Sequence, residues 1–213
     1  MNLFKQASFL LLPSRFLLMG LAAYIGLELI GALLLQLLPA FEYKEQNIVI
    51  SMRLLELAAF LILIKHFRMA ENLGLVFPDL KAIRIFAFIA IGCTCVVMVL
   101  YTIEPSWFAY VMLPAWLHGV SGLLLMILLA PVVEELVFRG LVYRMLREQW
   151  GIAVSVVISS VFFSLLHQGL IVSPQLLGGI IFALAYEWSR SLWVSIGLHI
   201  GANSAVYLLS RLA

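Results

Sequence analysis

Charged residues are scarce in this 213-residue sequence, because lysine, arginine, aspartate and glutamate together make up only 11% of it. An ordinary soluble domain is about one quarter charged and about half apolar. Here 64% of the residues are hydrophobic, and the mean hydropathy is +1.12. A water-soluble fold of this size cannot bury so much apolar surface, so a lipid bilayer must surround most of the chain.

Two further scarcities limit the partners and sites that the chain can have. The net charge is only +2 and the basic residues are scattered along the sequence, which argues against nucleic-acid binding. The only cysteines are Cys93 and Cys95, in an apolar run without histidine or carboxylate neighbours. Such a pair is a poor metal site, and we expect both side chains to pack against lipid or other helices.

Long apolar runs are abundant, and they predict an all-α, polytopic transmembrane helical bundle of about seven spans. We divide the chain into N-terminal transmembrane helices (1–105) and a second helical core (106–213), with a re-entrant or interfacial piece near 106–118. The spans are expected at Phe16–Leu38, Ile48–Ile64, Ile85–Tyr101, Leu113–Val142, Ile152–His167, Gln175–Trp188 and Leu192–Leu209.

The basic residues between these spans predict the orientation. Cytoplasmic loops of membrane proteins carry an excess of lysine and arginine. Of the 13 basic residues, Lys44 and Arg211 lie on one side, Arg53 and Arg139 lie within spans, and the other nine share the side of the N-terminus. We therefore expect a cytoplasmic N-terminus, in an integral protein of the bacterial inner membrane. The nine residues are Lys5, Arg15, Lys65, Arg68, Lys81, Arg84, Arg144, Arg147 and Arg190.

Ionisable residues within spans need a partner or a function, because each costs a few kcal/mol in hydrocarbon. Arg53 and Glu56 are three residues apart on one helical face, so we expect a structural ion pair, with support of a buried site as the alternative. Glu135 and Arg139 are four residues apart and can pair in the same way. Glu134 points about 100° away from Glu135 and must find its partner on another span. A carboxyl group in that position suits a general base or acid.

Two later spans supply partners for Glu134. A polar turn ending at Gly151 predicts a helical hairpin, in which His167 and Glu134 lie at nearly the same depth, roughly 24 Å from the turn. The last span contributes His199 and Asn203, four residues apart on one face and surrounded by small residues that permit close helix approach. Three spans thus bring polar groups toward one place.

The patterns E-E-x-x-x-R, F-x-x-x-H and H-x-x-x-N on successive helices resemble the CPBP family of intramembrane proteases. This family includes CAAX prenyl endopeptidases and bacteriocin-processing or immunity (Abi) proteins, and the resemblance covers about Leu113 to Leu209. It implies an intramembrane endopeptidase that acts on a membrane-anchored peptide or protein, with 106–213 as its catalytic core. By the same resemblance, Glu134 and His167 activate the attacking water, His199 and Asn203 stabilise the oxyanion, and Glu135, Arg139 and Phe163 support the site or engage substrate.

Several alternatives remain open at this point. Glu134, His167 and His199 could hold a catalytic zinc, although a glutamate-type mechanism without cofactor is favoured and no H-E-x-x-H motif is present. Serine catalysis by Ser164 lacks an acid to orient His167. The same polar groups could also form a structural network, or serve a transporter or a non-catalytic immunity or scaffold protein. The sequence predicts neither the oligomeric state nor the natural substrate.

Overall fold

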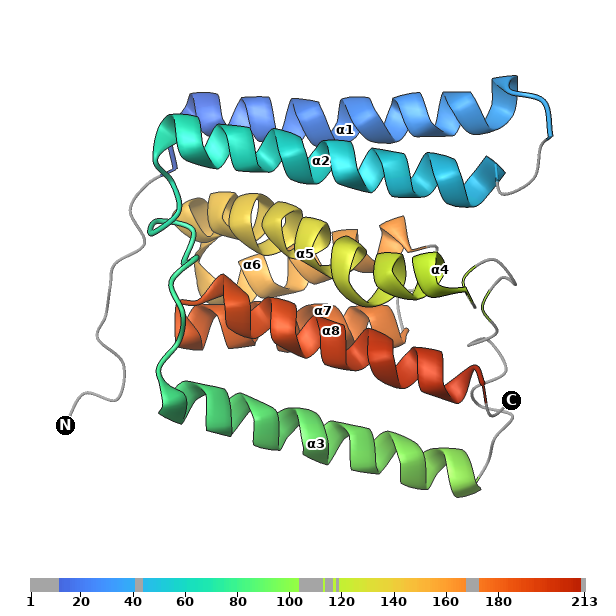
Figure 1. The fold of residues 1–213 in the computed structure, drawn as a ribbon. Coiled ribbons are helices and arrows are strands. Elements are labelled where there is room, and N and C mark those ends of the chain that lie inside the picture. Colours follow the sequence, from blue (N-terminus) through green and yellow to red (C-terminus); the bar gives the residue numbers. More distant parts are fainter. Residues whose placement is uncertain are drawn as a thin grey trace.

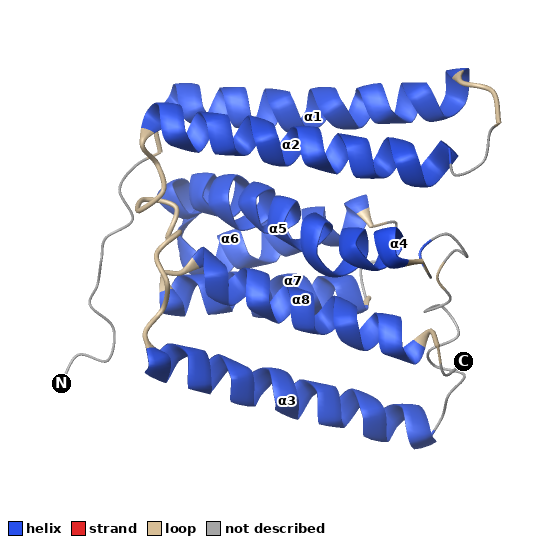
Figure 2. Ribbon diagram, in the orientation of Figure 1, coloured by secondary structure: helices blue, strands red, loops and turns tan. Residues whose placement is uncertain are grey.

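The structure, a computed structural model, describes residues 12–40, 44–103, 113, 117, 119–167 and 173–211. These residues form helices and connecting loops, without a strand among them (Figure 2). The all-α fold predicted from the sequence is therefore confirmed. Most of the predicted re-entrant piece at 106–118 lies outside the described residues.

The helices follow the predicted spans closely. Helices at the two ends of the chain are α1 (Ser14–Leu37), α2 (Lys44–Phe67), α3 (Leu80–Ile103), α7 (Pro174–Ser189) and α8 (Leu192–Leu209). The middle of the chain is a continuous helical stretch composed of α4 (Val120–Leu124), η3 (Leu125–Leu129), α5 (Ala130–Glu135), η4 (Leu136–Tyr143) and α6 (Arg144–Leu166). Four helical segments among the described residues are long and apolar enough to cross a membrane, namely α1, α2, Val120–Leu166 and α8.

Gly151 divides the long middle stretch into two spans. Its backbone is non-helical, with φ 76° and ψ −179°, a conformation that glycine adopts without a steric penalty. The chain turns back there. Phe138 packs edge-to-face against Phe163 at a ring distance of 5.0 Å, and Glu134 meets His167, so both pairs lie symmetrically about the turn. The predicted antiparallel hairpin is confirmed, and the middle stretch supplies two of the seven spans.

The central helices lie between two flanking groups. Figure 1 shows α1 and α2 side by side along one edge of the bundle, α3 along the opposite edge, and α4 to α8 between them. Buried side chains such as Phe16, Phe60 and Leu141 join the α1–α2 pair to η4 in one apolar core. Many large apolar side chains on the outside are exposed, for example Leu18 and Phe88. That exposure is expected where lipid, rather than water, covers the surface.

The two ends of the bundle differ in charge and in contacts. At one end, the 69–77 loop meets the ends of several helices, since Gly74 O accepts from Leu192 N at 2.9 Å and Leu73 O accepts from the Tyr186 hydroxyl at 3.0 Å. Leu12 N, just before α1, donates to Glu148 at this end. We call it the arginine-rich end; its basic residues among those described are Arg15, Lys65, Arg68, Lys81, Arg84, Arg144, Arg147 and Arg190.

The opposite end carries little charge. Gln46, at the start of α2, donates to Ser121 at the start of α4, so these two helices begin together. Lys44 lies beside them and donates to the carbonyl of Leu35 at 2.7 Å. Arg211 follows the last turn of α8. We call this end the cavity end, because a cavity among the helices lies toward it.

Candidate active site

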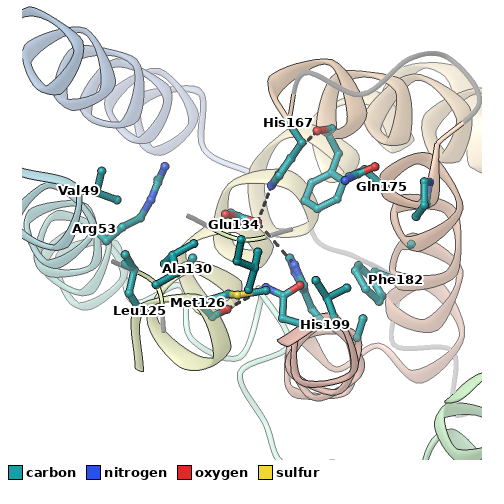
Figure 3. A pocket seen from close by; sticks show the side chains of 18 residues that line it. Val49, Arg53, Leu125, Met126, Ala130, Glu134, His167, Gln175, Phe182 and His199 are labelled. Carbon is teal, nitrogen blue, oxygen red and sulfur yellow. Dashed lines mark hydrogen bonds and ion pairs between the residues drawn. The ribbon is translucent and has the colours of Figure 1, made fainter. Parts of the chain in front are cut away.

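A cavity of about 460 Å³ lies among α2, η3, α5, α6, α7 and α8. Most of its wall is apolar, including Leu125, Met126 and Val206. The sequence predicted a site shared by the fourth, fifth and last spans, and the structure adds α2 and α7 to it. Six polar side chains interrupt the apolar wall: Arg53, Glu134, His167, Gln175, His199 and Asn203 (Figure 3).

Glu134 lies at the centre of these polar groups. Its Oε2 atom is 3.4 Å from Nε2 of His167 and 3.6 Å from Nε2 of His199, so two imidazoles from different helices face one carboxylate oxygen. Among the described residues, this buried oxygen has no hydrogen-bond partner within normal distance. An unpaired carboxylate oxygen is costly to bury, and it is therefore ready to accept a hydrogen bond from a molecule in the cavity.

The orientation of each imidazole is fixed by its other nitrogen. Nδ1 of His167 is 2.8 Å from the carbonyl oxygen of Phe163 in the preceding turn. A carbonyl oxygen can only accept, so Nδ1 carries the hydrogen, and Nε2 of the neutral ring has a free lone pair. Nδ1 of His199 is 2.9 Å from Oε1 of Glu135, and the same reasoning assigns its hydrogen to Nδ1. Both rings thus present Nε2 toward Glu134.

Glu135 occupies a closed network behind the cavity. Oε1 of Glu135 pairs with Arg139 at 2.7 Å, and Oε2 accepts from the hydroxyl of Ser195 on α8. The second guanidinium nitrogen of Arg139 donates to the carbonyl of Gly179 on α7 at 2.9 Å. The predicted Glu135–Arg139 pair is confirmed. Both side chains are fully buried and neither lines the cavity, so their position favours support of the site over contact with substrate.

Aromatic rings enclose this network and hold the two histidines. The Arg139 guanidinium lies 4.9 Å from the ring of Phe163 and 5.4 Å from that of Phe182, within cation–π range. Phe182 also stacks on His199 at 4.7 Å, and Phe163 contacts the ring of His167 at 4.5 Å. Phe163 therefore lines the cavity and contacts both the Arg139 guanidinium and the ring of His167.

Asn203 has a partner that the sequence analysis did not anticipate. The amide of Ala130 bonds to Leu125 O, five residues back, because η3 is a π-helix. In that register the carbonyl of Met126 would accept from residue 131, which is proline and has no N–H. Met126 O is thus left without a helical partner, and Asn203 Nδ2 donates to it at 2.8 Å. The other hydrogen of this amide remains for a second acceptor.

Arg53 forms the predicted ion pair with Glu56 and also lines the cavity. Its guanidinium contacts Glu56 one turn away and Glu28 on α1. The predicted Arg53–Glu56 pair is therefore confirmed, and its arginine lies at the cavity wall. Ser164 bonds to Ser173 at 2.7 Å, is buried and does not line the cavity, so the geometry does not favour the serine alternative.

Sequence reasoning missed three side chains of the site. Ser195, Phe182 and Gln175 occur in apolar runs, where one serine, phenylalanine or glutamine carries no distinguishing signal. Only the position of Ser195 one turn before His199 could have drawn attention to it. Across the described residues, no group of three or more His, Cys, Asp and Glu side chains is arranged to hold a metal ion.

The fold and the cluster together define an integral membrane protein with a polar centre enclosed by its helices. Comparison with protein families gives a more specific answer. Residues 114–205, somewhat less than half of the chain, match the family model described as Type II CAAX prenyl endopeptidase Rce1-like. The resemblance of the three motifs to the CPBP family of proteases is thereby confirmed. No curated protein and no solved structure matches the chain.

Proposed function

We propose that this protein is an intramembrane endopeptidase that hydrolyses a peptide bond with a water molecule activated by Glu134 and His167. The observation that carries the proposal is the convergence of Glu134 Oε2 and two imidazole Nε2 atoms on one cavity. A base, a second proton acceptor and nearby hydrogen-bond donors are what amide hydrolysis by water requires. The match to Rce1-like endopeptidases over residues 114–205 supports the same reaction class.

In the proposed reaction, a water molecule in the cavity donates one hydrogen bond to Glu134 Oε2 and the other to His167 Nε2. As the water oxygen attacks the carbonyl carbon of the substrate, its proton passes to Glu134. The peptide C–N bond then breaks, and Glu134 returns the proton to the leaving amine. The products are a carboxylic acid and an amine, and Glu134 ends as a carboxylate.

The oxyanion formed by attack needs hydrogen-bond donors. We assign this role to the free amide hydrogen of Asn203 and to Nε2 of His199. The His199 ring donates from Nε2 only when both of its nitrogens carry hydrogen, and its Nδ1 already faces the Glu135 carboxylate. Glu135, Arg139 and Ser195 act as positioning residues in this proposal, since Glu135 contacts His199 and is itself held by Arg139 and Ser195, and none of the three lines the cavity.

We propose a membrane-anchored protein or peptide as the substrate, in keeping with the mainly apolar cavity wall. Apolar side chains next to the cleaved bond would match the wall. We further propose a glutamate-type mechanism, without a resident metal, and a bacterial inner membrane as the location.

The test is cleavage of membrane-anchored reporter peptides by purified protein in detergent. Wild type is compared with Glu134→Gln, His167→Ala and the control Glu71→Gln, which changes an exposed carboxylate in the distant 69–77 loop. We expect both site variants to lose activity by roughly 10²–10⁴-fold with unchanged melting temperatures, and the control to keep it. Equal cleavage by Glu134→Gln would contradict the proposed site.

Each reaction is repeated after treatment with a zinc chelator. Full activity after treatment is expected for the glutamate mechanism, whereas loss that zinc restores would support the metal alternative. If folded wild type leaves a broad set of reporters uncut, the result favours the alternatives, a transporter or a non-catalytic immunity or scaffold protein.

A further inference from the structure

The cavity and the basic residues lie toward opposite ends of the bundle. Eight basic residues gather at the arginine-rich end, against Lys44 and Arg211 at the cavity end. Polar contacts tie the helices together at the arginine-rich end. Glu187 is bound there by Tyr143 at 2.7 Å and Arg190 at 2.7 Å, and Leu192 is tied to Gly74. These contacts join α7, α8, η4 and the 69–77 loop at the end away from the cavity.

The cavity wall is built from the opposite ends of the same helices. His167 is the residue directly after α6, Pro174 and Gln175 are the first two residues of α7, and Val49 lies near the start of α2. The side chain of His167 is 33% exposed, whereas that of His199, deeper in the bundle, is only 4% exposed. Accessibility therefore increases toward the cavity end.

The helices that line the cavity differ in length. At 1.5 Å per residue, the 16 residues of α7 span about 24 Å, whereas the 24 residues of α2 span about 36 Å. The α7 terminus at Tyr186 to Arg190 meets the 69–77 loop that follows α2, so the two helices are level at the arginine-rich end. At the other end α7 stops about 12 Å short of α2, and its first two residues, Pro174 and Gln175, line the cavity there.

Lysine and arginine accumulate on the cytoplasmic side of membrane proteins. We infer that the cavity opens to the extracytoplasmic side of the membrane, and that the substrate is a membrane-anchored polypeptide whose cleaved bond lies on that side. Glu134 lies about 21 Å along the helix from Val120, so the bond would be cut below the membrane surface. The substrate part of this inference rests on the proposed protease function, whereas the side of opening does not.

Cysteine labelling tests the side of opening without any need for activity. The full chain is expressed in bacterial cells with Cys93→Ala and Cys95→Ala, which remove two exposed thiols on α3. Single cysteines are then added as Gln175→Cys in the cavity, Glu45→Cys as an exposed control at the cavity end, and Glu71→Cys as an exposed control at the arginine-rich end. Intact cells and inverted membrane vesicles are treated with a small, membrane-impermeant thiol reagent.

We expect Gln175→Cys and Glu45→Cys to react in intact cells and Glu71→Cys to react only in inverted vesicles, with at least a tenfold difference in labelling rate between the two preparations. The inference is overturned if Gln175→Cys reacts on the same side as Glu71→Cys, or if the two controls show the reverse orientation. It is also overturned if Glu45→Cys reacts and Gln175→Cys reacts from neither side.

A second measurement tests the substrate part. Two anchored reporters carry the same cleavable segment on the extracytoplasmic or on the cytoplasmic side, and each is co-expressed with wild type or Glu134→Gln. Cleavage of only the extracytoplasmic reporter, by wild type alone, is expected. Cleavage of only the cytoplasmic reporter overturns the inference but keeps the protease. Cleavage of neither, with the labelling as expected, counts against the protease function and the substrate class while the side of opening stands.

Discussion

Glu134 and Glu135 are adjacent in the chain, yet their surroundings are opposite. Glu135 is fully buried and bound by Arg139, Ser195 and His199, so both of its oxygens are satisfied. Glu134 faces the cavity, with Oε2 unpaired and two Nε2 atoms at 3.4 and 3.6 Å. One side of the helix thus carries a carboxylate whose two oxygens are both bound, and the other carries a carboxylate with an oxygen that has no hydrogen-bond partner among the described residues.

This difference teaches how a buried site can be both rigid and reactive. A buried network of ion pairs and hydrogen bonds holds one arrangement, because breaking a contact leaves a charge or donor unpaired in a low-dielectric interior. His199 belongs to both sides, since Nδ1 contacts Glu135 and Nε2 faces Glu134. The contacts around Glu135 therefore orient the His199 ring, whose Nε2 faces Glu134 in the cavity.

The largest effect on stability is expected from Arg139→Leu. This variant leaves the buried Glu135 carboxylate without its cation, which costs about 3–5 kcal/mol of unfolding free energy. Glu134→Gln should cost less than about 1 kcal/mol, because Oε2 has no hydrogen bond to lose. Both are measured by unfolding in mixed micelles with increasing SDS, followed by tryptophan fluorescence. Equal losses for the two variants would show that the contrast between the carboxylates is wrong.

A smaller effect is expected from Ser195→Ala. The hydroxyl donates to Glu135, and its loss should lower the unfolding free energy by about 1–2 kcal/mol. Ser204→Ala is the matched control, since among the described residues that hydroxyl bonds only to Ile200 O of its own helix, at 2.7 Å, and its loss should cost little. If Ser195 positions His199, kcat for a cleaved reporter should also fall while KM stays near that of wild type. An unchanged kcat would limit Ser195 to a purely structural role.

The smallest effect is expected from Asn203→Ala, measured together with Pro131→Ala. Asn203→Ala should cost about 0.6–1.7 kcal/mol, because the Met126 carbonyl loses its donor. Pro131→Ala restores a backbone N–H that can bond to this carbonyl, so the cost of Asn203→Ala should be lower in that background. The double-mutant cycle measures this coupling directly. Additive effects would mean that the proline is not the reason for the Asn203 contact.

The fold and much of the site could be predicted from the sequence. Seven apolar runs, the turn at Gly151 and three polar motifs at helical spacing were sufficient to bring Glu134 and His167 together. Intrahelical pairs such as Glu135–Arg139 follow from spacing alone. The contact between Asn203 and Met126 could not be foreseen, because it depends on the π-helical register of η3, and a sequence read at 3.6 residues per turn does not show that register.

The sequence by itself determined that the chain lies in a bilayer, where its helices turn, which residues carry charge into the apolar interior and to which family its C-terminal part is similar. Those properties are local, because they depend on composition, on periodicity and on neighbours a few residues apart. Only the tertiary structure decided that Ser195 and Phe182 join the site, that α2 supplies Arg53, and that α7 ends short of the cavity end. These facts depend on contacts between helices distant in the chain, which side-chain packing selects.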